Sequence, residues 1–189
     1  TLQMPGISGQ DNNMILFEYS PSQPDRLQDI IENFGLIKAA EFDVVILRSS
    51  EKGFGYKHEI HIWLTSQDFI NGNLMILLAY IILGHPEWRR GLIKIFAIYP
   101  DAEAKKEKEK LVELINQGRL AISPNNVEVI AKKEESIKTI INQRSGDADL
   151  TLIGFQYEAL KKNSEDVFAG YDNLGNVLFV NTEIEKIIE

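Results

Sequence analysis

The stretch KHEIHIWLTSQDFINGNLMILLAYIILGHPEWRRGLIKIFAIYP, residues 57–100, decides the fold class. In its first part, apolar residues occupy every second position and so share one face of a strand: Ile60, Ile62 and Leu64. His61 and Trp63 share the opposite face. A Leu-rich helix is predicted over 73–84, and 91–100 is a nearly continuous apolar strand. Two apolar strands joined by a helix indicate a parallel strand–helix–strand unit.

The predicted helix is apolar on every side, from Leu74 to Leu83. We do not expect it to insert into a membrane, because a spanning helix needs about 20 mostly apolar residues and polar residues flank this run on both sides. A helix lying on a sheet needs only one apolar stripe. We therefore expect one side to pack on the sheet. The other side would meet the N-terminal segment, a first half that is missing from this sequence, or a second copy of the chain, and the sequence leaves these alternatives open.

The rest of the chain continues the alternation of strands and helices. Strands are predicted at 13–20, 42–50, 125–132, 149–155 and 175–183. Helices are predicted at 21–35, 101–118, 134–146, part of 157–173, and a short one at 184–189. Short apolar strands between helices are typical of an α/β fold: a doubly wound, mostly parallel sheet with helices on both faces.

The glycines and charges of EKGFG, residues 51–55, mark the best internal boundary. We expect a flexible lead over 1–12, a strand–helix–strand tail of a first α/β half-domain over 13–52, and a complete second half-domain over 56–189. Two strands cannot bury both faces of a sheet alone. The first unit should therefore join the larger sheet or belong to a domain whose beginning is missing.

Composition excludes several classes of protein. The chain has 189 residues, a formal net charge of -8 and no cysteine. An acidic chain argues against a nucleic-acid-binding face and against a polybasic membrane patch. Without cysteine there is no disulfide framework, no zinc–thiolate site and no cysteine nucleophile. The opening TLQMPGISGQDNN has no basic region and no apolar core, so we do not read it as a signal peptide.

Candidate chemistry is sparse. The histidines of HEIH, His58 and His61, are three apart in a strand-like segment and so lie on opposite faces, whereas a zinc-protease helix needs two histidines four apart. His85 lies at the end of the predicted helix. The sequence has no G-x-S-x-G elbow, no P-loop and no G-x-G-x-x-G after a strand. We therefore expect no enzyme activity, no cofactor, no metal, and no catalytic residue.

A nucleotide site needs separate consideration, because doubly wound sheets often bind ligands at the carboxyl ends of their strands. The fold resembles that of universal stress proteins. In their ATP-binding members, a glycine follows three residues after a strand like the one ending near Gly154, and a later Gly-Ser or Gly-Thr cradles the phosphates. Here that position is Tyr157, and the later glycines are followed by Tyr171 and Asn176. A stand-alone nucleotide-binding protein remains the alternative interpretation, and an enzyme on a flavodoxin-like sheet is a third.

The order of the pieces resembles the cytosolic C-terminal domain of cation–chloride cotransporters. That family has an aromatic-rich strand, a turn with glycine, a Leu-rich helix, a Trp–Arg or Trp–Lys pair, a strand like KIRIF and a charged helix. The counterparts here are Ile62 to Leu64, Asn71 and Gly72, Leu74 to Leu83, Trp88 and Arg89, and Lys94 to Phe96. Later, ADLTLIGFQ and NVLFVN resemble the strands that close the family's domain. The linker RSSEKGFGYK is short, unlike the phosphorylatable insertions of animal members, which suggests a compact prokaryotic-type member.

The resemblance implies a non-catalytic regulatory domain on the cytoplasmic side of the cell membrane. Its partners would be its twin in a homodimer and the transmembrane transport domain of the same polypeptide, which moves Na⁺ and/or K⁺ with Cl⁻. No ion-coordinating residue is expected here, because those residues belong to the membrane helices.

For the dimer interface we predict residues on the apolar helix and on the corner that follows it. They are Leu74, Leu78, Ile81, Trp88, Arg89 and Arg90. Trp and Arg are favoured at interfaces. A helix-to-strand corner without any partner is the competing interpretation of Trp88, Arg89 and Arg90.

Overall fold

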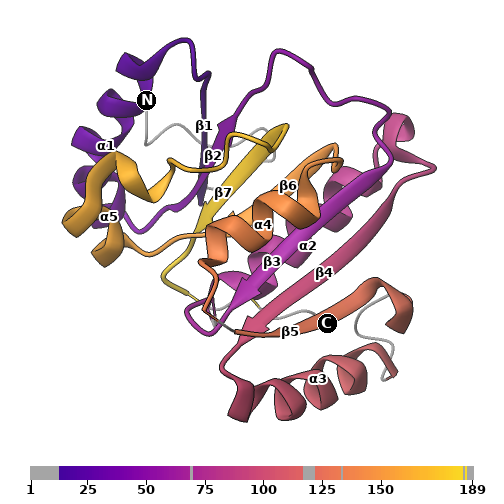
Figure 1. The fold of residues 1–189 in the computed structure, drawn as a ribbon. Coiled ribbons are helices and arrows are strands. Elements are labelled where there is room, and N and C mark those ends of the chain that lie inside the picture. Colours follow the sequence, from indigo (N-terminus) through magenta and orange to yellow (C-terminus); the bar gives the residue numbers. More distant parts are fainter. Residues whose placement is uncertain (1–12, 69, 117–121, 133, 185, 187–189) are drawn as a thin grey trace.

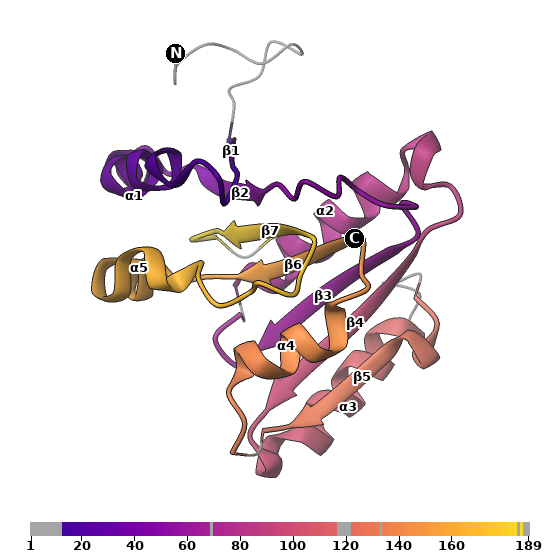
Figure 2. The ribbon, with the colours of Figure 1, turned by 45° about the horizontal axis from the view of Figure 1, so that its top comes forward.

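The computed structural model describes residues 13–68, 70–116, 122–132, 134–184 and 186. They form a seven-stranded sheet in the order β1-β2-β7-β6-β3-β4-β5. The strands are β1 (Met14–Tyr19), β2 (Asp43–Arg48), β3 (Glu59–Thr65), β4 (Leu92–Tyr99), β5 (Val127–Ala131), β6 (Leu150–Gly154) and β7 (Asn176–Asn181). Figure 2 shows β1 and β5 at opposite edges of this sheet.

Five strands form the doubly wound part of the sheet. β3, β4 and β5 follow one another outward in one direction, and β6 and β7 then continue from β3 in the other, with every neighbouring pair parallel. Helices connect them: α2 (Asn71–Leu83), α3 (Asp101–Asn116), α4 (Ile137–Ser145) and α5 (Tyr157–Asn163). Short 3₁₀ turns lie at Pro86–Trp88, Pro124–Asn126 and Ser164–Val167. The direction in which successive strands are added to the sheet reverses between β3 and β6, so the carboxyl ends of these two parallel strands flank the crevice in which this fold commonly binds ligands.

Helices cover both faces of the sheet, as predicted. Figure 1 shows α4 in front of the sheet and α2 behind it. The core on the α2 side includes Met75, Ile62 and Leu111, whereas the core on the opposite side includes Phe34, Trp63 and Ile141. Both faces of β3 are therefore buried, with Ile60, Ile62 and Leu64 in one core and Trp63 in the other. The predicted α/β, doubly wound, mostly parallel fold class is confirmed.

The N-terminal unit, β1–α1 (Pro24–Ala39)–β2, joins the same sheet. β2 pairs with β7 in antiparallel orientation, from Val44 opposite Asn181 to Arg48 opposite Val177. β1 and β2 therefore run against the other five strands. Of the two fates expected for this unit, the structure shows the first, a shared sheet. The division into two half-domains stays a prediction, and the expected lead 1–12 lies outside the described residues.

Individual element boundaries differ from the predictions in one informative place. The predicted end of α1 at Gly35 is wrong, because the helix runs on to Ala39. Phe34 and Ile37 continue its buried face, and that burial outweighs the helix-breaking tendency of glycine. A Cβ on Gly35 would lie 3.1 Å from the hydroxyl of Tyr157, so glycine lets α5 approach α1 closely. Most of the helix predicted at 184–189 lies outside the described residues.

Candidate functional site

The crevice at the carboxyl edge of the sheet is a cavity of about 530 Å³. Its walls come from the loop after β3, the end of β6, the first turn of α4, and the segment after α5. Gln156 bridges the two strand ends by donating from Nε2 to the carbonyl of Gln67 at 2.7 Å. The cavity therefore lies where a doubly wound sheet most often holds a ligand.

Asp68 is the buried acid of this crevice, with 7% of its surface exposed. Its Oδ2 accepts hydrogen bonds from the backbone N–H of Thr65 at 2.9 Å and from Thr65 Oγ1 at 2.7 Å. Burial raises the pKa of Asp68 above its usual 3.8, against the effect of these hydrogen bonds and of one from Asn71. Oδ1 lies over Gly154, where a side chain would collide with it. Asp68 is thus fitted into the end of the sheet rather than presented to solvent.

A network of buried amides lies behind Asp68. The carbonyl of Phe155 accepts hydrogen bonds from Asn71 Nδ2 at 3.1 Å and from Asn181 Nδ2 at 2.9 Å. Asn71 Oδ1 accepts the backbone N–H of Thr182 at 2.9 Å, and the hydroxyl of Thr182 donates to Asp43 at 2.5 Å. These bonds join α2, β6, β7 and β2 at one point. Satisfied buried networks of this kind fix a unique arrangement of elements.

Two lysines line this crevice, Lys132 and Lys138, and Lys138 is engaged by its own chain. Lys138, in the first turn of α4, donates to the carbonyls of Asp166 and Ala169 at 2.6 and 2.7 Å. Its Nζ lies 5.2 Å from the ring centroid of Tyr171. Burial lowers the pKa of Lys138. One of the two lysines that line the crevice therefore already donates to backbone carbonyls of its own chain.

A second polar group lies at the opposite, amino edge, where Ser145, His61 and Glu59 form a chain of hydrogen bonds. Trp63 Nε1 donates to Ser145 Oγ at 2.8 Å, so the serine hydroxyl is left to donate to His61 Nδ1 at 2.8 Å. His61 Nε2 then donates to Glu59 Oε2 at 2.8 Å. Lys94 Nζ donates to the other oxygen of Glu59 at 2.9 Å.

The pKa shifts fit a neutral imidazole in this chain. Burial lowers the pKa of His61 below its usual 6.5, although the hydrogen bond with Glu59 pulls it upward. Burial alone would raise the pKa of Glu59, but the hydrogen bonds from Lys94 and His61 outweigh it and lower that pKa. Glu59 is therefore a carboxylate held by two donors.

The connection of a serine, a histidine and an acid resembles that of a hydrolase triad, but the geometry does not suit one. Ser145 is 0% exposed, and its oxygen already accepts the indole N–H of Trp63. A nucleophile must reach a substrate carbonyl from an open site. This arrangement holds the ring of His61 in one orientation and joins α4 to β3.

The predicted pairing of faces along β3 is seen directly. His61 and Trp63 both hydrogen-bond Ser145, whereas Ile60, Ile62 and Leu64 belong to the core on the α2 side. His58 is exposed just before β3, and His85 is exposed at the start of the 3₁₀ turn Pro86–Trp88. Within the described ranges, no three His, Asp or Glu side chains are grouped to hold a metal ion.

The six predicted interface residues divide into two groups. Leu74, Leu78 and Trp88 are buried in this chain's own core, where α2 packs on β3, β6 and β7. Ile81 is 71% exposed, and Arg89 and Arg90 are exposed at the corner before β4. Most of the surface of the apolar helix is thus buried within the chain, and the exposed apolar side chain of Ile81 lies in its last turn. The interface role of all six stays a prediction.

The buried guanidinium of Arg48 was not apparent from the sequence. It lies at the end of β2 and donates to the carbonyls of Tyr171, Leu174 and Gly175 at 2.9, 3.0 and 3.3 Å. Burial lowers the pKa of Arg48, which nearby Tyr19 and Asp172 partly offset. Arg48 fastens β2 to the loop that leads into β7.

Comparison with known proteins supports the fold. No protein-family model matches the sequence, and no curated protein does. The crystal structure of the cytoplasmic domain of a prokaryotic cation chloride cotransporter matches with a TM-score of 0.56 and 16% identity, covering 90% of this chain and 64% of that one. A functionally unknown protein from Pseudomonas aeruginosa PAO1 matches with a TM-score of 0.52 and 16% identity, covering 88% and 62%.

These two comparisons establish the fold and no more. The chain spans less than two thirds of the length of either structure. Among the helices of the described ranges, none has the length and apolar character needed to cross a bilayer.

Proposed function

We propose that this chain is a non-catalytic regulatory and dimerising domain of a membrane transporter that carries Na⁺ and/or K⁺ together with Cl⁻. The observation that carries the proposal is the structural likeness, over 90% of this chain, to the cytoplasmic domain of a prokaryotic cation chloride cotransporter. The order of sequence features around Trp63, the apolar helix and Trp88 supports the same family. The domain would lie on the cytoplasmic side of the cell membrane, joined to the transport domain of the same polypeptide.

The transporter part of the proposal is tested with the complete gene product in cells. We expect a tagged product to remain in the membrane fraction after high-salt washing, and to support chloride-dependent uptake of rubidium. Deleting this domain should change the rate or regulation of uptake without removing the product from the membrane. A product found only in the soluble fraction would sink the proposal.

The dimer part is tested on the isolated chain by light scattering across a concentration series. Ile81 and Leu36 offer a matched pair, because each is 71% exposed, one on α2 and the other on α1. We expect Ile81→Asp to weaken self-association by about tenfold or more, since a buried apolar anchor contributes over 1.4 kcal/mol. Leu36→Asp should leave it unchanged. A wild-type chain that stays monomeric at high micromolar concentration contradicts dimerisation, and equal effects of the two variants contradict the α2 surface.

The second candidate function is nucleotide binding by a stand-alone protein, favoured by the cavity at the carboxyl edge. Calorimetric titration with ATP separates the two. The transporter-domain proposal predicts no heat of binding, because Asp68 and Lys138 are engaged by their own chain and the sequence after Gly154 lacks the glycine pattern of ATP-binding members.

A further inference from the structure

The amino edge of the sheet carries a second, larger cavity of about 820 Å³. It exists because α4 has nine residues and is about 14 Å long, whereas β4 has eight residues and extends about 26 Å. The helix covers Phe96 and Trp63 on this face and ends before the first residues of the strands. Polar side chains occupy the uncovered part.

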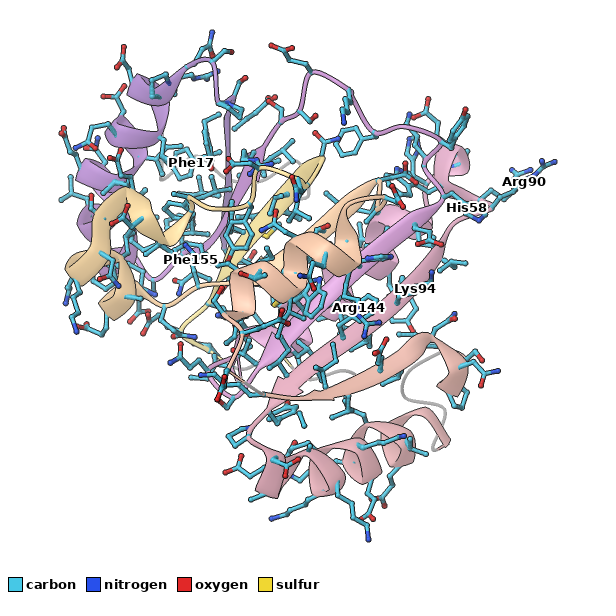
Figure 3. The ribbon with its side chains drawn as sticks, viewed as in Figure 1. Phe17, His58, Arg90, Lys94, Arg144 and Phe155 are labelled. Carbon is cyan, nitrogen blue, oxygen red and sulfur yellow. The ribbon has the colours of Figure 1, made fainter. Side chains whose placement is uncertain are left out.

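Two cations on the floor of this cavity are held in place but keep unused donors. Lys94 Nζ gives one of its three hydrogens to Glu59. Arg144, from the last turn of α4, donates from Nη1 to Glu128 Oε2 at 3.1 Å, and its Nη2 lies 3.0 Å from Glu128 Oε1 in the same ion pair. Three of its five N–H groups remain. Figure 3 shows Lys94 and Arg144 on the same side of the sheet, and both line the cavity.

One carboxylate in the cavity is unengaged. Asp147, two residues beyond α4, is exposed and makes no hydrogen bond or ion pair with any residue the structure describes. Asp149, by contrast, accepts the backbone N–H groups of Tyr56, His58 and Glu59 at 3.2, 2.8 and 3.0 Å. The cavity therefore offers free donors from two cations beside one free acid.

The charges of the lining residues restrict which class of ligand this cavity can bind. Carboxylates outnumber permanent cations among the lining residues: Glu59, Glu128, Asp147 and Asp149 against Lys94 and Arg144. Such a site repels a simple anion, and its unused N–H groups are poor partners for a simple cation. A small molecule with both charges satisfies both sets of groups.

We propose that this cavity binds a free α-amino acid, with its carboxylate on Arg144 and Lys94 and its ammonium group on Asp147. The N–H groups of Arg144 that Glu128 leaves unused can donate to the oxygens of a ligand carboxylate. Glu128 and Glu59 keep the two cations from rotating away, so little side-chain order is lost on binding. This inference does not depend on the transporter-domain proposal.

The test is a titration of isotope-labelled protein with L-glutamine, followed by the amide signals of residues around the cavity. Acetate and methylamine serve as the two halves of the ligand. We expect L-glutamine to shift the signals of Lys94 and Arg144, and each half to bind at least about tenfold more weakly. The proposal is overturned if acetate binds as tightly as L-glutamine, if L-glutamine shifts only signals elsewhere, or if it shifts none.

Two variants and a control complete the test. Arg144→Gln and Asp147→Asn should each weaken binding by about tenfold to a hundredfold, the range for a lost charged hydrogen bond. Both positions are exposed, so the fold should survive. Lys161→Gln removes an exposed cation that pairs with Glu158 on α5, away from the cavity, and should leave affinity unchanged. A loss of affinity in Lys161→Gln as large as that in Arg144→Gln would refute the site, because both changes remove one positive charge and only Arg144 lines the cavity.

Discussion

Replacing Gly154 with alanine should place a methyl group in the space that the buried carboxyl group of Asp68 occupies. An ideal Cβ at this position would lie 1.8 Å from Asp68 Oδ1, 2.7 Å from its Cγ and 3.1 Å from Asn71 Nδ2. Asp68 cannot step aside freely, because Thr65 holds its other oxygen through two hydrogen bonds. The backbone of Gly154 lies outside the left-handed region, so the effect would come from this collision alone.

The magnitude follows from two contributions. Overpacking a well-filled interior costs about 1–3 kcal/mol. Moving the carboxylate off Thr65 adds about 1.5–3 kcal/mol for a charged hydrogen bond. We therefore expect Gly154→Ala to lower the free energy of unfolding by about 3–5 kcal/mol.

Urea unfolding followed by tryptophan fluorescence measures this loss, since both tryptophans, Trp63 and Trp88, are buried. The matched background is Asp68→Ala, which removes the atoms that the new methyl group would strike. In that background Gly154→Ala should cost less than about 1 kcal/mol, giving a coupling energy of about 2 kcal/mol or more. A loss below about 0.5 kcal/mol in the wild type, or the same loss in both backgrounds, would refute the reasoning.

Two further predictions concern the buried ionisable side chains of Arg48 and His61. Arg48→Met should lower the free energy of unfolding by about 2–4 kcal/mol, because three carbonyls lose a charged donor. Hydrogen exchange should accelerate first in β2 and β7. Exchange that accelerates equally throughout the sheet would contradict a local role of Arg48 in holding β2 to the loop before β7. Because the pKa of His61 is lowered in the folded protein, there is a pH range in which the unfolded chain binds a proton that the folded chain does not. The free energy of unfolding should therefore fall as the pH drops from 6.5 toward the pKa of His61 in the folded protein, by at most about 1.4 kcal/mol per pH unit. Urea unfolding at a series of pH values should show this slope in the wild type and its loss in His61→Gln; a variant that keeps the full slope would assign it to another group.

Local patterns in the sequence were sufficient to predict the main strands and helices. β3 and β4 were predicted to within two residues, because most of their residues are apolar and turn residues bound them. The alternation along β3 also placed His61 and Trp63 on one face, which the shared contact with Ser145 bears out. The end of α1 was missed because the packing of Ile37, which lies beyond a glycine, depends on a partner strand that the local sequence does not reveal.

The polar sites were mostly invisible in the sequence. Arg48 reads as an ordinary charged residue at the end of a strand, and only the return of the loop before β7 makes it a buried donor. Asp68 carried a faint signal, an acid three residues after Thr65 at the carboxyl end of a strand. The amino-edge cavity could not be foreseen, since it depends on the length of α4 relative to the strands it covers.

The antiparallel junction between β2 and β7 also has a consequence for the order in which the protein folds. Asp43 and Thr182 are hydrogen-bonded across 139 residues of sequence, so β7 is synthesised well after the strand with which it pairs. On the ribosome, β1, α1 and β2 emerge before β7 and cannot bury Val44, Val45 and Ile46 until β7 arrives. Closing so long a loop is slow, which makes docking of the N-terminal unit a late step. Until β7 pairs with it, the exposed edge of β2 is the surface that a chaperone, or β7 of a neighbouring chain, would bind in place of the chain's own β7.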